Sequence, residues 1–172
     1  IDVGGKDELA VFYKLCNLLQ INCRIIADYD ALFRGKLREY FCSSEIVKSK
    51  FNEKGFGFEV SNCIGEIERI LVKVGDALNV SAPENEYVKK IVEKLHVLYV
   101  ERGNNIDSIK DIVLLSIYRF KELIKEACPD IKDDVETFLS KHRLYLDCIK
   151  NANIFIIPNG ELEHFFKASS VD

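Results

Sequence analysis

The amino-acid sequence predicts an α/β fold in which a small parallel sheet, flanked by helices, is interrupted by a large helical insertion. Short apolar runs of strand character occur only near the two ends of the chain, and apolar residues at helical spacing fill the part between them. Strands joined by helical crossovers run parallel, and ligands bind at the edge formed by their carboxyl ends. Each strand-like run here leads into a turn with acidic residues, so these residues should meet at one edge.

The amino-terminal part reads as strand, helix and strand. Residues 1–3 end an apolar run, residues 4–5 are glycines that make a turn, and a helical stripe follows over residues 9–19. Residues 23–27 then form a short, largely apolar strand that ends in Asp-Tyr-Asp at 28–30. The helical stripe consists of Leu9, Phe12, Tyr13, Leu15, Cys16 and Leu19.

Four helical stripes fill most of residues 36–150, and strand character returns only at residues 153–157. We therefore assign residues 1–35 and 151–172 to an α/β core, and 36–150 to a mainly helical insertion within the same domain. The stripes are Ile64, Ile67, Leu71, Val74 and Leu78; Val88, Ile91, Leu95 and Leu98; Ile109, Val113, Phe120 and Ile124; and Val135, Phe138, Leu139, Leu146 and Ile149.

Composition narrows the class of protein. With 172 residues, 48% of them apolar, the chain can bury a core as one domain. It begins at Ile1 and contains no methionine, which suggests a processed product or a piece of a longer polypeptide. The six cysteines form no C-x-x-C pair and predict reduced thiols in a cytoplasmic protein. No apolar run reaches the ~18 residues of a membrane helix, so no membrane association is expected. The net charge of −4 leaves room for a local basic patch only.

Asp28 and Asp30 are the sharpest chemical feature. Side chains at i and i+2 of an extended chain point to the same side, so the two carboxylates converge on one small volume. Like charges this close shift each other's protonation unless a cation neutralises them, and carboxylate oxygens suit a hard ion such as Mg²⁺. The alternative interpretation is a solvated turn, in which an aspartate side chain accepts a hydrogen bond from the nearby backbone.

Two further acidic clusters accompany this pair. Asp2, Asp7 and Glu8 surround the first turn, and Glu161 and Glu163 follow the last strand. All three clusters come after apolar strands of one predicted parallel sheet, which would bring them to a single edge. Chance produces three such clusters less often than it produces one.

The order of these motifs resembles the Toprim domain of OLD-family nucleases, which are linked to ATPases. The resemblance spans nearly the whole chain and includes a strand, a glycine-rich acidic turn and a helix, then I-I-A-D-Y-D-A-L, then a helical insertion, and finally I-F-I-I-P-N-G-E-L-E. The closing I-P-x-G-E-L-E is its most specific element, because all Toprim proteins, including topoisomerases and primases, share the D-x-D.

The resemblance implies roles for individual residues. Asp28 and Asp30 match the D-x-D metal ligands, and Glu163, together with Glu161, matches the acidic residue after the last strand. Asp7 lies where the family often has a second acidic residue. The implied activity is endonucleolytic hydrolysis of DNA, with RNA as the alternative substrate, and the implied cofactor is Mg²⁺ or Mn²⁺.

The first strand departs from the family pattern, since Val3 stands where the family has a glutamate directly before glycine. Either Asp2 takes over the role of that glutamate, or the metal site is partly degraded. In the implied mechanism one ion activates the attacking water and a second, ~3.5–4 Å away, stabilises the leaving oxygen. Asp2 or Asp7 would hold the first ion. Lys6 would bind the scissile phosphate, unless it is only a solvated lysine at a helix start.

Basic residues follow directly after the predicted metal ligands. Arg34, Lys36 and Arg38 begin a segment in which aromatic residues are interleaved, and such a segment is typical of contacts to a nucleic-acid backbone. An amphipathic helix with a solvated basic face explains the same residues equally well.

Two rival functions remain open. The turn at residues 4–7 is similar to the PP-loop of ATP pyrophosphatases, but Val3 and Glu8 replace its serines, and a carboxylate repels phosphate. The chain could instead be a catalytically weakened Toprim module for assembly or sensing. No P-loop motif occurs in it, so the expected ATPase domain or subunit would lie in another segment or chain. We further expect an oligomer and a role in anti-phage defence or DNA repair.

Overall fold

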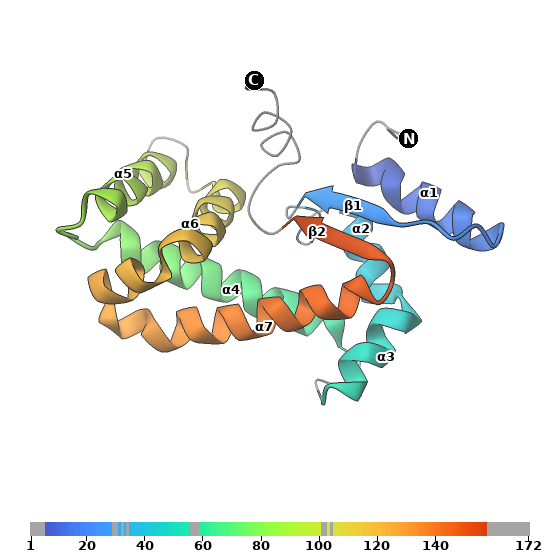
Figure 1. Cartoon of the computed structure of the whole chain (residues 1–172). Helices are drawn as coiled ribbons and strands as arrows, with labels where there is room; N and C mark the ends of the chain where they lie inside the picture. The colour runs from blue at the N-terminus through green and yellow to red at the C-terminus, as the bar shows by residue number, and fades with distance from the viewer. Residues whose placement is uncertain are drawn as a thin grey trace, which may run out of the picture. The chain divides into compact units, whose positions relative to one another are not determined.

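The computed structural model of the chain describes residues 6–28, 31, 33, 35–55, 59–100, 103 and 105–157. These residues are mostly helical and contain one two-stranded parallel sheet (Figure 1). The helices are α1 (Lys6–Leu18), α2 (Gly35–Ser43), α3 (Glu45–Glu53), α4 (Val60–Asn79), α5 (Glu86–Val100), α6 (Ile106–Ala127) and α7 (Lys132–Lys150), with a short 3₁₀ helix, η2 (Pro129–Ile131), before α7.

The parallel sheet confirms the central feature of the predicted α/β fold. Strand β1 (Ile25–Asp28) pairs in parallel with β2 (Ile154–Ile157), and Figure 1 shows the two strands side by side. The helices between them confirm the predicted helical segment. The strand predicted at residues 1–3 lies outside the described part of the chain.

The chain divides into two compact units, each of which is described by itself. The first comprises the described residues of Ile1–Ile64 and Arg143–Asp172, and it holds the sheet. The second is Gly65–His142. The division into an α/β core and an insertion at residues 36–150 stays a prediction.

The turn before β2 fixes the sheet to α1 in the first unit. Asn153 adopts a left-handed conformation with φ of 58°, which reverses the chain after α7. The carbonyl of Asn153 then accepts a hydrogen bond of 2.9 Å from the Ile25 amide. The Tyr13 hydroxyl of α1 donates a buried hydrogen bond to the Ala152 carbonyl. One turn therefore joins the start of β1, the start of β2 and the middle of α1.

One face of the sheet belongs to the core of the first unit. Ile25 and Ala27 of β1 and Ile154 of β2 are buried. Aromatic rings continue this core, because the ring centroid of Tyr145 lies 6.2 Å from that of Phe41 and 5.8 Å from that of Phe51, both edge-on. All three rings are fully buried. Edge-to-face pairs of this kind add a modest attraction to the burial of the rings.

The apolar stripe predicted for helix α1 does not coincide with the buried side of the helix. Of that stripe only Tyr13 and Cys16 are buried, whereas Phe12, Leu15 and Leu19 are exposed. Apolar residues occur on both sides of this helix, so periodicity alone did not identify the buried side. The exposed apolar face of α1 consists of Val11, Phe12, Leu15 and Leu18.

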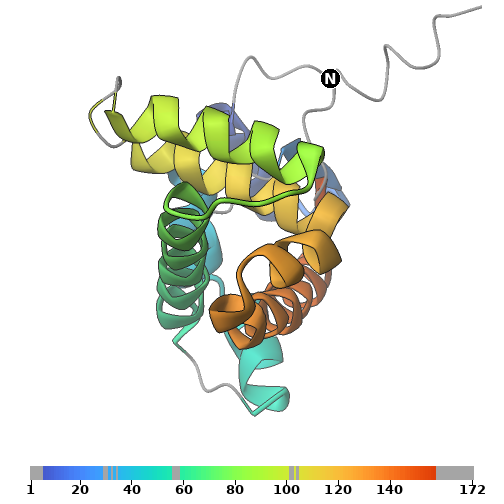
Figure 2. The ribbon, with the colours of Figure 1, turned by 90° about the vertical axis from the view of Figure 1, so that its left-hand side faces the viewer.

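The stripes predicted for α4 and α5 are confirmed, because all of their members are buried. Helices α5 and α6 lie side by side, as Figure 2 shows. Gly75 of α4 permits close packing, because a Cβ atom there would lie 2.9 Å from Ile109 and 3.1 Å from the Tyr99 hydroxyl. Any larger residue at this position would therefore push these helices apart.

The stripe predicted for α6 is only partly buried. Ile109, Val113 and Ile124 belong to the core, but Phe120 is half-exposed and has a non-helical backbone with φ of −135° and ψ of 25°. This kink turns Phe120 toward α5, where its ring stacks on Tyr87 at a centroid distance of 5.6 Å. The kink breaks the helical period that the prediction assumed.

A buried lysine in the second unit is neutralised by two carboxylates. Lys110 forms ion pairs with Glu68 at 2.8 Å and with Asp107 at 3.0 Å. Burial alone would lower the pKa of Lys110, but the bonds to these carboxylates outweigh it and raise the pKa. A buried charge held in this way is stable only while its partners remain.

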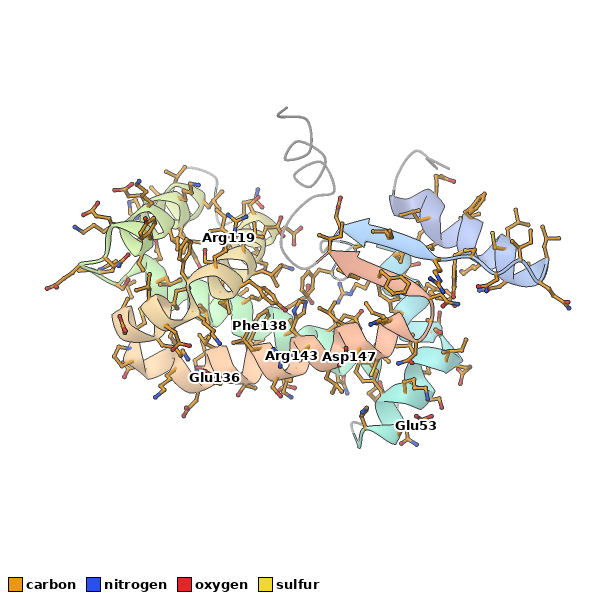
Figure 3. All side chains as sticks on the ribbon, viewed as in Figure 1. Glu53, Arg119, Glu136, Phe138, Arg143 and Asp147 are labelled. Atoms are coloured by element: carbon orange, nitrogen blue, oxygen red, sulfur yellow. The ribbon has the colours of Figure 1, made fainter. Side chains whose placement is uncertain are left out.

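A histidine is buried in the core of the second unit. The His142 ring stacks on Phe138 of α7, labelled in Figure 3, at a centroid distance of 5.2 Å, and its Nδ1 lies 2.5 Å from the Tyr118 hydroxyl. Burial lowers the pKa of His142 from 6.5 to about 4. The folded state therefore keeps this histidine neutral at pH values where the unfolded chain protonates it.

This shift predicts a loss of stability in mild acid. The stabilisation that depends on neutral His142 should be complete above pH 6.5. As the pH drops toward 4, the free energy of unfolding should fall by about 3 kcal/mol because of this residue. In His142→Gln the fall between these values should be smaller, whereas His96→Gln, at an exposed position, should behave like the wild type. Urea unfolding at a series of pH values measures this. Equal pH dependence in His142→Gln and the wild type would show that the prediction is wrong.

Candidate functional site

The candidate site is the edge of the sheet at the carboxyl ends of its strands. Asp28 is the last residue of β1, and in the parallel register it lies opposite Ile157, the last residue of β2. Asp28 is half-exposed. Side chains alternate along a strand, so Asp28 shares the face of Ile26, which is 56% exposed, and not the buried face of Ala27.

This register brings together the ends of two segments that are far apart in the sequence. The D-x-D motif starts at the end of β1, and the P-N-G-E-L-E segment begins directly after the end of β2. The predicted site residues Asp30, Glu161 and Glu163 themselves lie outside the described residues, as do Asp2 and Arg34.

Lys6 and Asp7 are the first two residues of α1, but their side chains lie outside the described part. Among the described residues, no group of three or more histidine, cysteine, aspartate or glutamate side chains is placed to hold a metal ion. A metal centre at this edge therefore needs carboxylates from the segments that follow β1 and β2.

Two basic residues that were predicted to contact nucleic acid, Lys36 and Arg38, differ in their surroundings. Both belong to α2, where Lys36 is exposed and Arg38 is half-buried. The Arg38 guanidinium donates a hydrogen bond of 3.0 Å from Nη1 to the carbonyl of Phe33. Arg38 therefore ties α2 to the Phe33 backbone, whereas the Lys36 side chain is exposed.

Two lysine–glutamate ion pairs lie along α3 of the first unit. On α3, Lys48 lies 3.0 Å from Glu45, and Lys50 lies 2.6 Å from Glu53, which is labelled in Figure 3. The hydrogen bond from Lys50 lowers the pKa of Glu53. Exposed pairs of this kind contribute little to stability, and they neutralise part of the basic charge predicted for this segment.

Sequence reasoning missed one pair of neighbouring thiols. Cys16, in α1, lies near enough to Cys23, just before β1, to help raise the pKa of the Cys23 thiol. Their separation in the sequence matches no known thiol motif, so only the turn between them could have indicated this contact.

No protein-family model, curated protein or solved structure matches the chain. Within the part of the chain that the structure describes, every helix is too short or too polar to cross a membrane.

The contrast between Lys36 and Arg38 predicts different effects of their substitution. If α2 contacts DNA as the sequence predicts, Lys36→Gln should weaken this binding and reduce the slope of log affinity against log salt concentration by ~1. Arg38→Gln should also lower the free energy of unfolding by about 1 kcal/mol, since the Phe33 carbonyl loses its donor.

Fluorescence anisotropy with a labelled duplex at several salt concentrations, combined with urea unfolding, measures both effects. Lys90→Gln is the matched control, because Lys90 is exposed on α5, outside the candidate site. An equal loss of affinity in Lys36→Gln and Lys90→Gln would contradict a specific role for α2.

Proposed function

We propose that the chain is a metal-dependent endonuclease domain of the Toprim type that hydrolyses phosphodiester bonds of DNA. The observation that carries this proposal is the parallel register in which Asp28 lies opposite Ile157. This register supports an arrangement in which the D-x-D and G-E-L-E segments follow the neighbouring ends of two parallel strands. The resemblance to OLD-family nucleases requires such an arrangement. RNA is the alternative substrate.

The chemistry of the donor set fits a hard divalent cation. Carboxylate oxygens are the ligands that Mg²⁺ and Mn²⁺ prefer, and Mg²⁺ sites retain several waters, which suits a half-exposed position such as that of Asp28. Asp28 and Asp30 would hold the metal, with Glu163 or Glu161 as the third carboxylate. When bound, such ions supply a deprotonated water nucleophile and stabilise the leaving oxygen.

Residues of the first helix and of α2 would position the nucleic acid. Asp2 or Asp7 would complete the carboxylate set, and Lys6 would bind the scissile phosphate. Lys36, exposed on α2 and close in sequence to the D-x-D, would contact the backbone of the substrate. A cytoplasmic location and a role in anti-phage defence or DNA repair belong to the same proposal.

The second candidate is a catalytically weakened Toprim module that assembles with an ATPase domain or subunit. The exposed apolar face of α1 favours it, because contiguous exposed apolar side chains mark interaction surfaces. Val3 at the position of the family's glutamate also supports it. The PP-loop pyrophosphatase remains a third and weaker proposal.

Metal-dependent nicking of plasmid DNA separates the nuclease from the module. The wild type should nick supercoiled plasmid with Mg²⁺ or Mn²⁺, whereas Asp28→Asn and Glu163→Gln should reduce nicking to the level without metal. Calorimetry should show weaker Mn²⁺ binding by Asp28→Asn than by Asp7→Asn, because the end of a paired strand is fixed by the sheet.

Asp133→Asn is the control, since Asp133 is an exposed carboxylate in the first turn of α7. It should retain both nicking and metal binding. Metal binding without nicking would favour the assembly module. Equal metal affinity in the wild type and Asp28→Asn would overturn the metal site itself.

The exposed apolar face of α1 further predicts self-association of the isolated chain. Leu15 and Leu18 are 49% and 81% exposed, so replacing both with lysine removes apolar contact area without opening a cavity. Leu15→Lys/Leu18→Lys should sediment as a monomer at concentrations where the wild type associates, with unchanged thermal stability. Val80→Lys, at a position 83% exposed, should associate like the wild type. A wild type that is monomeric throughout would contradict the expected oligomer.

A further inference from the structure

The turn that ends α1 has the geometry of a Schellman motif. The Ile21 amide donates to the Cys16 carbonyl at 2.8 Å, and the Gln20 amide donates to the Asn17 carbonyl at 3.1 Å. Gln20 is left-handed, with φ of 56°, at the position where such motifs usually carry glycine. This motif sends the chain back along the end of the helix. It thereby brings Cys23 beside Cys16.

The two cysteines occupy complementary positions. Cys16 is 5% exposed in the last turns of α1, whereas Cys23 is half-exposed two residues before β1. The Cys16 thiol helps to raise the pKa of the neighbouring Cys23 thiol, and both thiols are free. The other four cysteines belong to different segments: Cys42 to α2, Cys63 to α4, Cys128 to the end of α6 and Cys148 to α7.

We propose that Cys16 and Cys23 are a redox-active dithiol, which a peroxide converts into an intramolecular disulfide. A cytoplasmic protein would use such a bond transiently, because the thiol pools of that compartment reduce it again. The inference is independent of the nuclease proposal. It requires only the fold around the end of α1.

The difference in exposure indicates which cysteine reacts with peroxide and which one then forms the disulfide. The Cys23 thiolate, which solvent reaches, attacks one oxygen of hydrogen peroxide; the O–O bond breaks, hydroxide leaves, and Cys23 becomes a sulfenic acid. The sulfur of Cys16 then attacks the sulfur of Cys23. The S–O bond breaks, the S–S bond forms, and the Cys16 proton leaves with the hydroxyl group as water. In total, two thiols are oxidised and one peroxide is reduced to two waters.

The surroundings of Cys23 determine how readily its thiol is oxidised. Burial, and secondarily the neighbouring Cys16 thiol, raises the pKa of the Cys23 thiol. Only a small fraction is therefore thiolate at neutral pH, and the thiolate is the reactive form. The pair should stay reduced in ordinary aerobic buffer and close only on exposure to peroxide.

Closure would restrict the chain between α1 and the sheet. The disulfide would link the last turns of α1 to a position two residues before Ile25, where β1 starts. Cross-links stabilise a fold mainly by limiting the unfolded chain, and they do so only if the folded geometry accepts the bond. The oxidised chain should therefore unfold at a higher temperature than the reduced chain.

Peptide mapping of the whole chain tests the proposal directly. Lys14 and Arg24 flank the pair, so trypsin releases residues 15–24 as one peptide that contains Cys16 and Cys23 and no other cysteine. After peroxide treatment, unfolding and alkylation, this peptide should be two hydrogens lighter than its reduced form and carry no alkyl group. The other four cysteines should be alkylated. Reduction with dithiothreitol before alkylation should restore both alkyl groups.

Three variants distinguish the order of the reaction. In Cys16→Ala, Cys23 should stop at the sulfenic acid, which dimedone captures, and in Cys23→Ser, Cys16 should remain alkylatable. Cys42→Ser, at another half-exposed thiol, should leave the disulfide in residues 15–24 unchanged.

Closure should also be several-fold faster in the folded chain than in urea, because the Schellman motif holds the sulfurs together. Equal rates in the two states would overturn the proposal, as would dimers linked through Cys23 on a non-reducing gel. A residues 15–24 peptide that stays doubly alkylated after peroxide treatment would overturn it as well.

Discussion

The parallel pairing of β1 with β2 is the contact on which the first unit depends. The strands come from opposite ends of the described chain, and the register from Ile25 opposite Ile154 to Asp28 opposite Ile157 joins them. An isolated pair of short strands is marginally stable, so it needs support from neighbouring elements. The bond from Tyr13 to the Ala152 carbonyl supplies this support at the start of β2. Burial raises the pKa of Tyr13, which keeps the hydroxyl protonated as the donor.

Much of the fold could be predicted because most helices are amphipathic in a regular way. Every member of the α4 stripe is fully buried, since one apolar face leaves a helix only one way to pack. Helix α1 lacks this asymmetry. Its buried side was therefore decided by specific contacts, such as that of Tyr13, which periodicity does not contain. At Phe120, local backbone geometry replaced the helical period.

The candidate site was predictable to the extent that it depends on strand ends. An apolar strand that ends in a carboxylate identified Asp28, and parallel pairing placed it opposite the end of β2. Residues of the same chemical class have different surroundings in the structure where one tertiary contact involves only one of them. Arg38 and Lys36 look alike in the sequence, yet the Phe33 carbonyl accepts a hydrogen bond from the Arg38 guanidinium. Cys16 and Cys23 meet because Gln20 is left-handed, a conformation that its residue type does not favour.

The kink at Phe120 also affects which part of α6 unfolds locally first. A continuous helix protects its amides as one cooperative segment, whereas a break creates two shorter segments with ends of their own. The segment after the kink is held by Lys125, which lies 2.9 Å from Glu122 and 2.6 Å from Glu136. The carboxylates of these ion pairs are exposed, so solvent and salt weaken them. Within α6, the amides after Phe120 should therefore undergo hydrogen–deuterium exchange earlier than the amides before it. The boundary between early- and late-exchanging amides then falls inside a helix.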